Sequence, residues 1–112
     1  HRAAQKVMAD FGGAFPASPV DLAQLPGVGR STAAAIAAFS FGARSAILDG
    51  NVKRVLTRWA GIDGDINKTA TTKQLWQLAT RVTPNKDSGH FAQAMMDMGA
   101  TLCTKAKPAC LL

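Results

Sequence analysis

The sequence predicts an all-α domain, and three observations support this prediction. Apolar residues recur at spacings of three and four residues, which is the period of one face of a helix. No stretch in which apolar and polar residues alternate exceeds three residues, so the sequence predicts no strand. Glycine and proline separate the periodic segments, as they do where helices end.

Each predicted helix has a start or stop signal of its own. A first helix over residues 1–11 ends at Gly12. Ser18 caps the second helix, a proline follows in its first turn, and Asp21 is placed to return a capping-box bond. That helix ends after Leu25, where the next residue is a proline. The other four helices are predicted over about residues 30–41, 50–60, 71–82 and 87–102.

One apolar face on each of these four helices forms the predicted core. Trp59 and Trp76 are expected to be core residues, and Met95, Met96 and Met98 are expected to fill the core. The predicted faces consist of Ala33, Ile36, Ala37 and Ser40; Val52, Val55, Leu56 and Trp59; Leu75, Leu78, Ala79 and Val82; and Phe91, Ala94, Met95, Met98 and Leu102.

Length and composition limit the classes of protein to which the chain can belong. Its 112 residues suffice for one domain and not for two, so residues 1–112 are expected to form a single domain. Apolar residues make up 47%, but 21 of them are alanine, which predicts a core of closely approaching helices. Thirteen lysines and arginines against seven aspartates give a net charge of +6, which favours an anionic polymer as partner.

Several other classes are excluded. No apolar stretch approaches the length that spans a membrane, no signal-peptide pattern opens the chain, and two cysteines do not make a secreted disulfide scaffold. We therefore expect a soluble, cytoplasmic protein that works as a monomer. The chain begins at His1 rather than at a methionine, which indicates a piece of a longer protein.

Residues 25–30 carry the most specific local signal. A proline ends one helix, two glycines permit the tight hairpin that follows, and the next helix begins directly after Gly29. The unpaired N–H groups at that helix start favour a bound phosphate, and Arg30 adds a positive charge. The alternative is an ordinary corner between two helices with no ligand. The segment reads Leu25-Pro26-Gly27-Val28-Gly29-Arg30.

This segment, with the helices on either side at about residues 18–41, resembles the helix-hairpin-helix element of DNA repair proteins. The resemblance implies that hairpin amides bind a backbone phosphate of double-stranded DNA, with a monovalent cation held by hairpin carbonyls. Lys53 is expected to add to this surface, on the helix side that also carries Arg54 and Arg58. The residues assigned to DNA binding are Leu25, Gly27, Val28, Gly29, Arg30, Ser31 and Lys53.

Asp49 stands at a predicted helix start, where the helix dipole favours an ionised carboxylate. Most aspartates at such positions only cap the helix, and this is the alternative. An aspartate about two dozen residues after the hairpin resembles the helix-hairpin-helix glycosylase superfamily. That resemblance implies that Asp49 stabilises the cationic sugar formed as a base leaves, or attacks its C1′ atom. It also implies that Asn51 orients the aspartate or the sugar.

Three runs of residues distinguish the branches of this superfamily. In the endonuclease III branch a lysine nucleophile follows the hairpin arginine, but here Ser31 stands at that position and cannot form an imine. Residues 29–33, 47–55 and 93–100 are similar to the corresponding runs of adenine DNA glycosylases of the MutY type. The resemblance extends over nearly the whole chain. The resemblance implies a six-helix-barrel fragment of an enzyme that removes adenine mispaired with 8-oxoguanine or guanine, without strand cleavage. Asp97 would lie near the extruded adenine, unless it is an ordinary surface aspartate.

Cys103 and Cys110 match the start of an iron–sulfur motif in this family. The motif has the spacing C-x6-C-x2-C-x5-C and binds a [4Fe–4S] cluster. Cys103 and Cys110 correspond to its first two ligands, and the third would fall at position 113. The resemblance therefore implies a cluster in the full-length parent and none in this fragment. Two unrelated thiols are the alternative.

Two alternatives to the adenine glycosylase function remain open at this point. One is a non-catalytic helix-hairpin-helix DNA-binding module, in which Asp49 only caps its helix. The other is a thymine or uracil mismatch glycosylase of the same superfamily. The resemblance also implies a glutamate general acid, and the chain contains no glutamate, so the fragment alone is expected to be inactive. The parent enzyme is expected in the bacterial cytoplasm, where it acts on the nucleoid.

Overall fold

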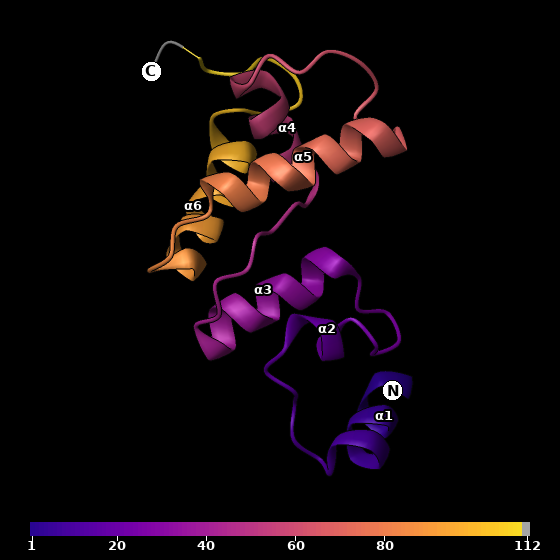
Figure 1. The fold of residues 1–112 in the computed structure, drawn as a ribbon. Coiled ribbons are helices and arrows are strands. Elements are labelled where there is room, and N and C mark those ends of the chain that lie inside the picture. The colour runs from indigo at the N-terminus through magenta and orange to yellow at the C-terminus, as the bar shows by residue number, and fades with distance from the viewer. Residues whose placement is uncertain (111–112) are drawn as a thin grey trace.

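The computed structural model describes residues 1–110, which form six helices and no strand (Figure 1). The all-α prediction is confirmed. Apart from the end of the second helix, the observed helix ends lie within two residues of the predicted ones. The helices are α1 (Arg2–Phe11), α2 (Pro19–Leu22), α3 (Arg30–Phe41), α4 (Gly50–Trp59), α5 (Thr69–Val82) and α6 (Ser88–Thr101).

The second helix ends earlier than predicted. α2 stops at Leu22, whereas the sequence predicted helix as far as Leu25. The N–H of Gln24 donates to the carbonyl of Asp21 at 3.1 Å, and the N–H of Leu25 donates to that of Leu22 at 3.1 Å. These bonds span three residues instead of four, so the chain tightens into turns ahead of the proline.

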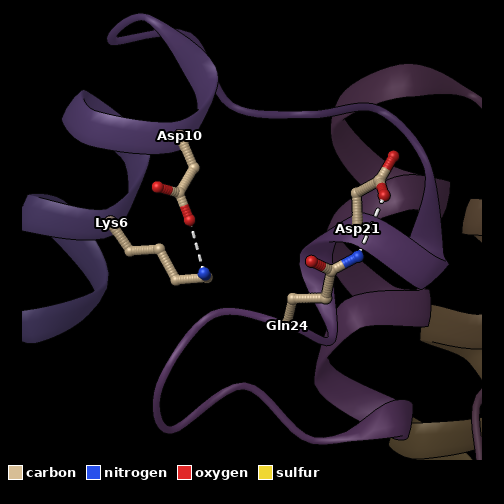
Figure 2. Close-up of polar contacts among 4 residues, drawn as sticks. All are labelled: Lys6, Asp10, Asp21 and Gln24. Atoms are coloured by element: carbon tan, nitrogen blue, oxygen red, sulfur yellow. Dashed lines mark hydrogen bonds and ion pairs between the residues drawn. The ribbon is translucent and has the colours of Figure 1, made fainter.

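The start of α2 agrees with the predicted cap in one respect and differs in another. Ser18 Oγ accepts a hydrogen bond from the N–H of Val20 at 3.2 Å, as an N-cap residue should. Asp21 does not return the predicted capping-box bond. Its carboxylate instead accepts a hydrogen bond of 3.2 Å from the side-chain amide of Gln24, which lies two residues beyond the end of α2 (Figure 2).

Two groups of helices lie at opposite ends of an elongated molecule, with extents of 50 × 29 × 24 Å (Figure 1). α1 to α3 form one end, α4 to α6 form the other, and residues 42–49 connect them without helical structure. Each end has its own buried core. The first consists of Val7, Leu22, Leu25, Ala33 and Ala37, and the second of Leu48, Val52, Leu56, Leu75 and Ala79. None of the described helices is both long and apolar enough to cross a membrane.

A third, smaller cluster joins the two ends. It consists of Ala34 from α3, Ile47 from the connector and Ala92 from α6. Nearby, one guanidinium nitrogen of Arg44 donates to the carbonyls of Thr80 and Thr83, at 2.9 and 2.8 Å. Arg44 thereby satisfies carbonyls at the C-terminal end of α5, which have no partner within the helix, and holds the connector against that helix.

The structure corrects part of the predicted core. Trp59 is 70% exposed, and Met98 is 45% exposed, so neither fills the core. α6 turns a different face to α4: a Cβ added at Gly99 would lie only 2.6 Å from the Cβ of Asn51. The glycine at position 99 therefore permits the close approach of the two helices. Met95 and Met96 pack against the second core, as predicted, whereas Met98 faces outward. The exposed members of the predicted faces are Ser40, Trp59, Ala94, Met98 and Leu102.

Candidate active site

The hairpin between α2 and α3 is a hydrogen-bonded turn. The N–H of Val28 donates to the carbonyl of Leu25 at 3.0 Å, which closes a four-residue turn. Pro26 occupies the second position, and Gly27 occupies the third with a φ of +81°. A type II turn needs a positive φ at the third position, which glycine adopts without strain, and often has proline at the second. The local sequence therefore accounts for the turn.

The turn leaves bare backbone at the start of α3. The first helical bond runs from the N–H of Ala33 to the carbonyl of Gly29 at 2.9 Å. The N–H groups of Arg30, Ser31 and Thr32 have no acceptor among the described residues. A Cβ added at Gly29 would meet nothing within 4 Å, and its φ of −82° suits any residue. Nothing in the described chain therefore requires glycine at position 29. The unpaired N–H donors beside it face open space, where an anion could bind.

The hairpin side chains divide between the core and the surface. Leu25 is 2% exposed within the first core, and Val28 packs against that core. The side chain of Leu25 is therefore closed to a ligand at the turn, and its backbone remains available. Arg30 is exposed, and its guanidinium carbon lies 3.8 Å from the ring centroid of Trp76 in α5. This cation–π contact was not predicted, and Trp76 is half-buried at the edge of the second core.

Asp49 is the N-cap residue of α4, as predicted. Its Oδ1 atom accepts a hydrogen bond of 2.8 Å from the N–H of Val52. The side chain is half-buried, and no described residue donates to its second oxygen, Oδ2. Oδ2 is therefore available to an electrophile.

Ser31 connects the hairpin helix to Asp49. Its Oγ atom accepts a hydrogen bond of 3.0 Å from the backbone N–H of Leu48. Ile47 and Leu48 are both buried. The segment that leads into Asp49 is therefore fixed by core packing and by the hydrogen bond from Leu48 to Ser31. The structure therefore brings together the two features that the sequence singled out, the hairpin and the aspartate.

Asn51 follows Asp49 by two residues, but its side-chain oxygen is engaged elsewhere. Its Oδ1 atom accepts a hydrogen bond of 2.8 Å from a guanidinium nitrogen of Arg54. Among the described residues, no hydrogen bond joins Asn51 to Asp49. Arg54 also donates to the carbonyl of Gly99 and, at 2.7 Å, to that of Cys103. Arg54 therefore links the first turn of α4 to the end of α6.

Arg58, one turn further along α4, contacts the segment after α6. It donates to the carbonyl of Thr104 at 2.7 Å and to the sulfur of Cys103 at 3.3 Å. Arg54 and Arg58 thus bind the C-terminal segment of the chain, whereas the sequence placed them on a DNA-binding side. Of that predicted side only Lys53, which is half-buried, has no side-chain partner among the described residues. The sequence offered one signal for this role of Arg54: Asn51 and Arg54 are three residues apart on one helix, a spacing at which side chains contact each other.

Among the described residues, no hydrogen bond joins Asp97 to Asp49. It is exposed on α6, and its carboxylate accepts a hydrogen bond of 2.8 Å from the amide of Gln93 one turn earlier. Cys103 and Cys110 both line one largely apolar depression of about 560 Å³. Within residues 1–110, no group of three or more histidine, cysteine or acidic side chains could hold a metal ion. Two thiols fit half of a four-thiolate site.

Comparison with known proteins supports the resemblance. A family model described as a helix-hairpin-helix motif matches residues 10–39. The adenine DNA glycosylase of Buchnera aphidicola (strain APS) is 42% identical over 112 residues, which are 100% of this chain and 32% of that protein. Human adenine DNA glycosylase is 45% identical over 108 residues, which are 96% of this chain and 20% of that protein. The chain spans about a third or less of the length of these curated relatives.

Solved structures show the same fold. A thermostable thymine-DNA glycosylase superimposes with a TM-score of 0.87 and 35% identity, over 97% of this chain and 50% of that one. A trapped endonuclease III–DNA covalent intermediate superimposes with a TM-score of 0.82, over 97% of this chain and 49% of that one. The latter is 22% identical and shows the fold alone. The similarity to adenine DNA glycosylases that the three runs of residues indicated is confirmed.

Proposed function

From its similarity to a segment of adenine DNA glycosylases, we propose that the whole protein is a monofunctional enzyme of that activity. It would hydrolyse the N-glycosidic bond of adenine paired with 8-oxoguanine or guanine in double-stranded DNA. One observation carries the proposal: the hydrogen bond between Ser31 and Leu48 connects a hairpin with unpaired N–H donors to the half-buried carboxylate of Asp49. We also propose that the protein acts as a monomer on the bacterial chromosome.

The hairpin would hold the DNA through a backbone phosphate. The free N–H groups of Arg30, Ser31 and Thr32 point out of a helix start, whose dipole favours an anion. Because Gly29 has no side chain, a phosphate can approach the backbone closely. Carbonyls of the turn could add a monovalent cation. Contacts of this kind position DNA and read no sequence.

Asp49 would act on the sugar. As the bond to adenine breaks, positive charge builds up on C1′ and on the ring oxygen, and a carboxylate fixed nearby lowers the energy of that state. Asp49 is suited to this because the N–H of Val52 and the start of α4 stabilise its charge through Oδ1. Oδ2 is left to face the sugar, as an electrostatic stabiliser or as a nucleophile. Asp97 would lie nearer the base.

Ser31 would limit the chemistry to base removal. Strand cleavage in this superfamily needs an amine that forms an imine with the opened sugar. The Ser31 hydroxyl cannot form one, and its oxygen already accepts the N–H of Leu48. The chain contains no glutamate, so the acid that protonates the leaving adenine would come from another part of the whole protein. Cys103 and Cys110 would be two of the four thiolate ligands of a [4Fe–4S] cluster there.

A substrate panel tests the proposal. Duplexes that pair adenine with 8-oxoguanine, adenine with guanine, thymine with guanine and uracil with guanine would be incubated with the whole protein, and the released base would be identified. Release of adenine from the first two supports the proposal. Release of thymine or uracil instead would favour the second candidate, a mismatch glycosylase. The TM-score of 0.87 to the thymine-DNA glycosylase is the observation that favours this candidate. Binding without release of any base would indicate a non-catalytic DNA-binding module.

A further inference from the structure

A broad groove runs along α5 from the hairpin end of α3. Its volume is about 1160 Å³, and the side chains that line it include Arg30, Lys73, Gln77 and Arg81. A second depression of about 530 Å³ shares Arg30, Trp76 and Thr80 with the groove, so the two form one continuous surface. No aspartate lines either depression, although the chain has seven. The lining is otherwise mostly apolar, so its cations have no acidic residue beside them.

The cations of the groove are free to meet an anion. Lys73 and Arg81 are exposed, and neither forms an ion pair or a side-chain hydrogen bond among the described residues. With Gln77 they form a row at every fourth residue of α5, about 12 Å long at the usual rise of a helix. Arg30, at the other wall, is held by its stacking on Trp76. A stacked guanidinium loses less conformational entropy when it binds a ligand.

The groove continues the surface that we assign to DNA. Arg30 is the first residue of α3, so it stands at the hairpin N–H donors and also lines the groove. A DNA strand held at the hairpin can reach the row on α5 along this groove without meeting an aspartate. The row offers point charges and amides at intervals, which suits a phosphodiester backbone better than the irregular carboxylates of a folded acidic protein.

We propose that the sugar–phosphate backbone next to the hairpin-bound phosphate lies in this groove and that Lys73 and Arg81 each neutralise one phosphate. This inference rests on the proposed DNA-binding function and deepens it. The contacts would extend the footprint of the protein beyond the hairpin and would be independent of sequence, because only phosphates are touched.

The test compares two double variants that lose the same charge. Lys73→Gln with Arg81→Gln removes the two groove cations, and Arg2→Gln with Lys86→Gln removes two exposed cations that do not line the groove. Glutamine is about as good a helix former as lysine or arginine, so both variants should fold, which thermal unfolding would check. The affinity of the 112-residue chain for duplex DNA is then measured at a series of salt concentrations.

The slope of log affinity against log salt is the decisive quantity. Each phosphate contact contributes about 0.9 to it, so the groove variant should lose about 1.8 and the control variant close to none. Equal slopes in the two variants, or an unchanged slope in the groove variant, would overturn the inference. So would a polyglutamate peptide that binds the chain, loses its binding in the groove variant and leaves DNA binding unchanged. Absence of salt-dependent DNA binding by the unmodified chain would instead refute the proposed function itself.

Discussion

Ser31 Oγ accepts a hydrogen bond of 3.0 Å from the backbone N–H of Leu48, across the junction between the two ends of the molecule. Ser31 is the second residue of α3, and Leu48 is 3% exposed in the core that contains α4 and α5. Asp49 follows Leu48 directly. The position of the carboxylate relative to the hairpin therefore depends on a side chain that is also central to the proposed chemistry.

Replacing Asp49 by asparagine in the whole protein is expected to slow adenine release by about a hundredfold or more. Asparagine removes the negative charge that stabilises the sugar, but it caps a helix as well as aspartate, so α4 and DNA affinity should be retained. Single-turnover kinetics and a duplex titration measure the two quantities. Adenine release at the unmodified rate would show that Asp49 is only a helix cap.

Replacing Ser31 by lysine in the whole protein is expected to allow borohydride to trap a covalent adduct with DNA. The new amine can form the imine that the hydroxyl cannot. The adduct is detected as a band of reduced mobility on a denaturing gel, and the unmodified protein should give none. Efficient trapping by the unmodified protein would contradict the role assigned to Ser31.

Replacing Ser31 by alanine should lower the free energy of unfolding by about 1 kcal/mol, because the N–H of the buried Leu48 loses its acceptor. Thr32→Ala is the matched control, since Thr32 is exposed and its hydroxyl makes no hydrogen bond among the described residues. Urea unfolding of the 112-residue chain measures both values. Equal stability of the two variants would show that the bond between Ser31 and Leu48 contributes little.

Replacing Gly29 by alanine should weaken duplex binding by about tenfold while leaving the melting temperature nearly unchanged. The added methyl group meets no atom of the chain, but it occupies the space that a phosphate needs. Gly27→Ala is the contrasting variant: a φ of +81° strains alanine, so it should cost about 1 kcal/mol of stability. Salt-dependent titrations and thermal melts separate the effects. Unchanged affinity in Gly29→Ala would argue against a phosphate at the hairpin.

Replacing Arg54 by methionine should lower the free energy of unfolding by about 2–3 kcal/mol, since Asn51 Oδ1 and the carbonyls of Gly99 and Cys103 lose a charged donor. Lys86→Met is the control, because Lys86 is exposed and has no side-chain partner among the described residues. Arg54→Lys should recover only part of the loss, as one ammonium cannot reproduce a planar fork. Urea unfolding measures all three. Similar losses in both methionine variants would contradict the structural role of Arg54.

The sequence was informative where the determining interactions are local. Gly42 ends α3 with a φ of +66°, and Asp49 caps α4, as their residue types predict. The hairpin turn needs only a proline and a glycine in adjacent positions. The contacts of Arg54 with residues 99 and 103 could not be predicted in the same way, because their partners lie 45 and 49 residues away.

By itself, then, the sequence determined the helices, the hairpin and the capping aspartate, since each results from bonds within a few residues of the chain. Tertiary structure alone decided which side chains of different helices contact one another and which face the surface. It turned Trp59 to the surface, because the close contact of Gly99 with Asn51 sets how α4 and α6 approach. It also placed Arg30 over Trp76, 46 positions apart in the sequence. Hydrophobic periodicity defines a helix face, but the packing of the helix against its neighbours determines where that face points.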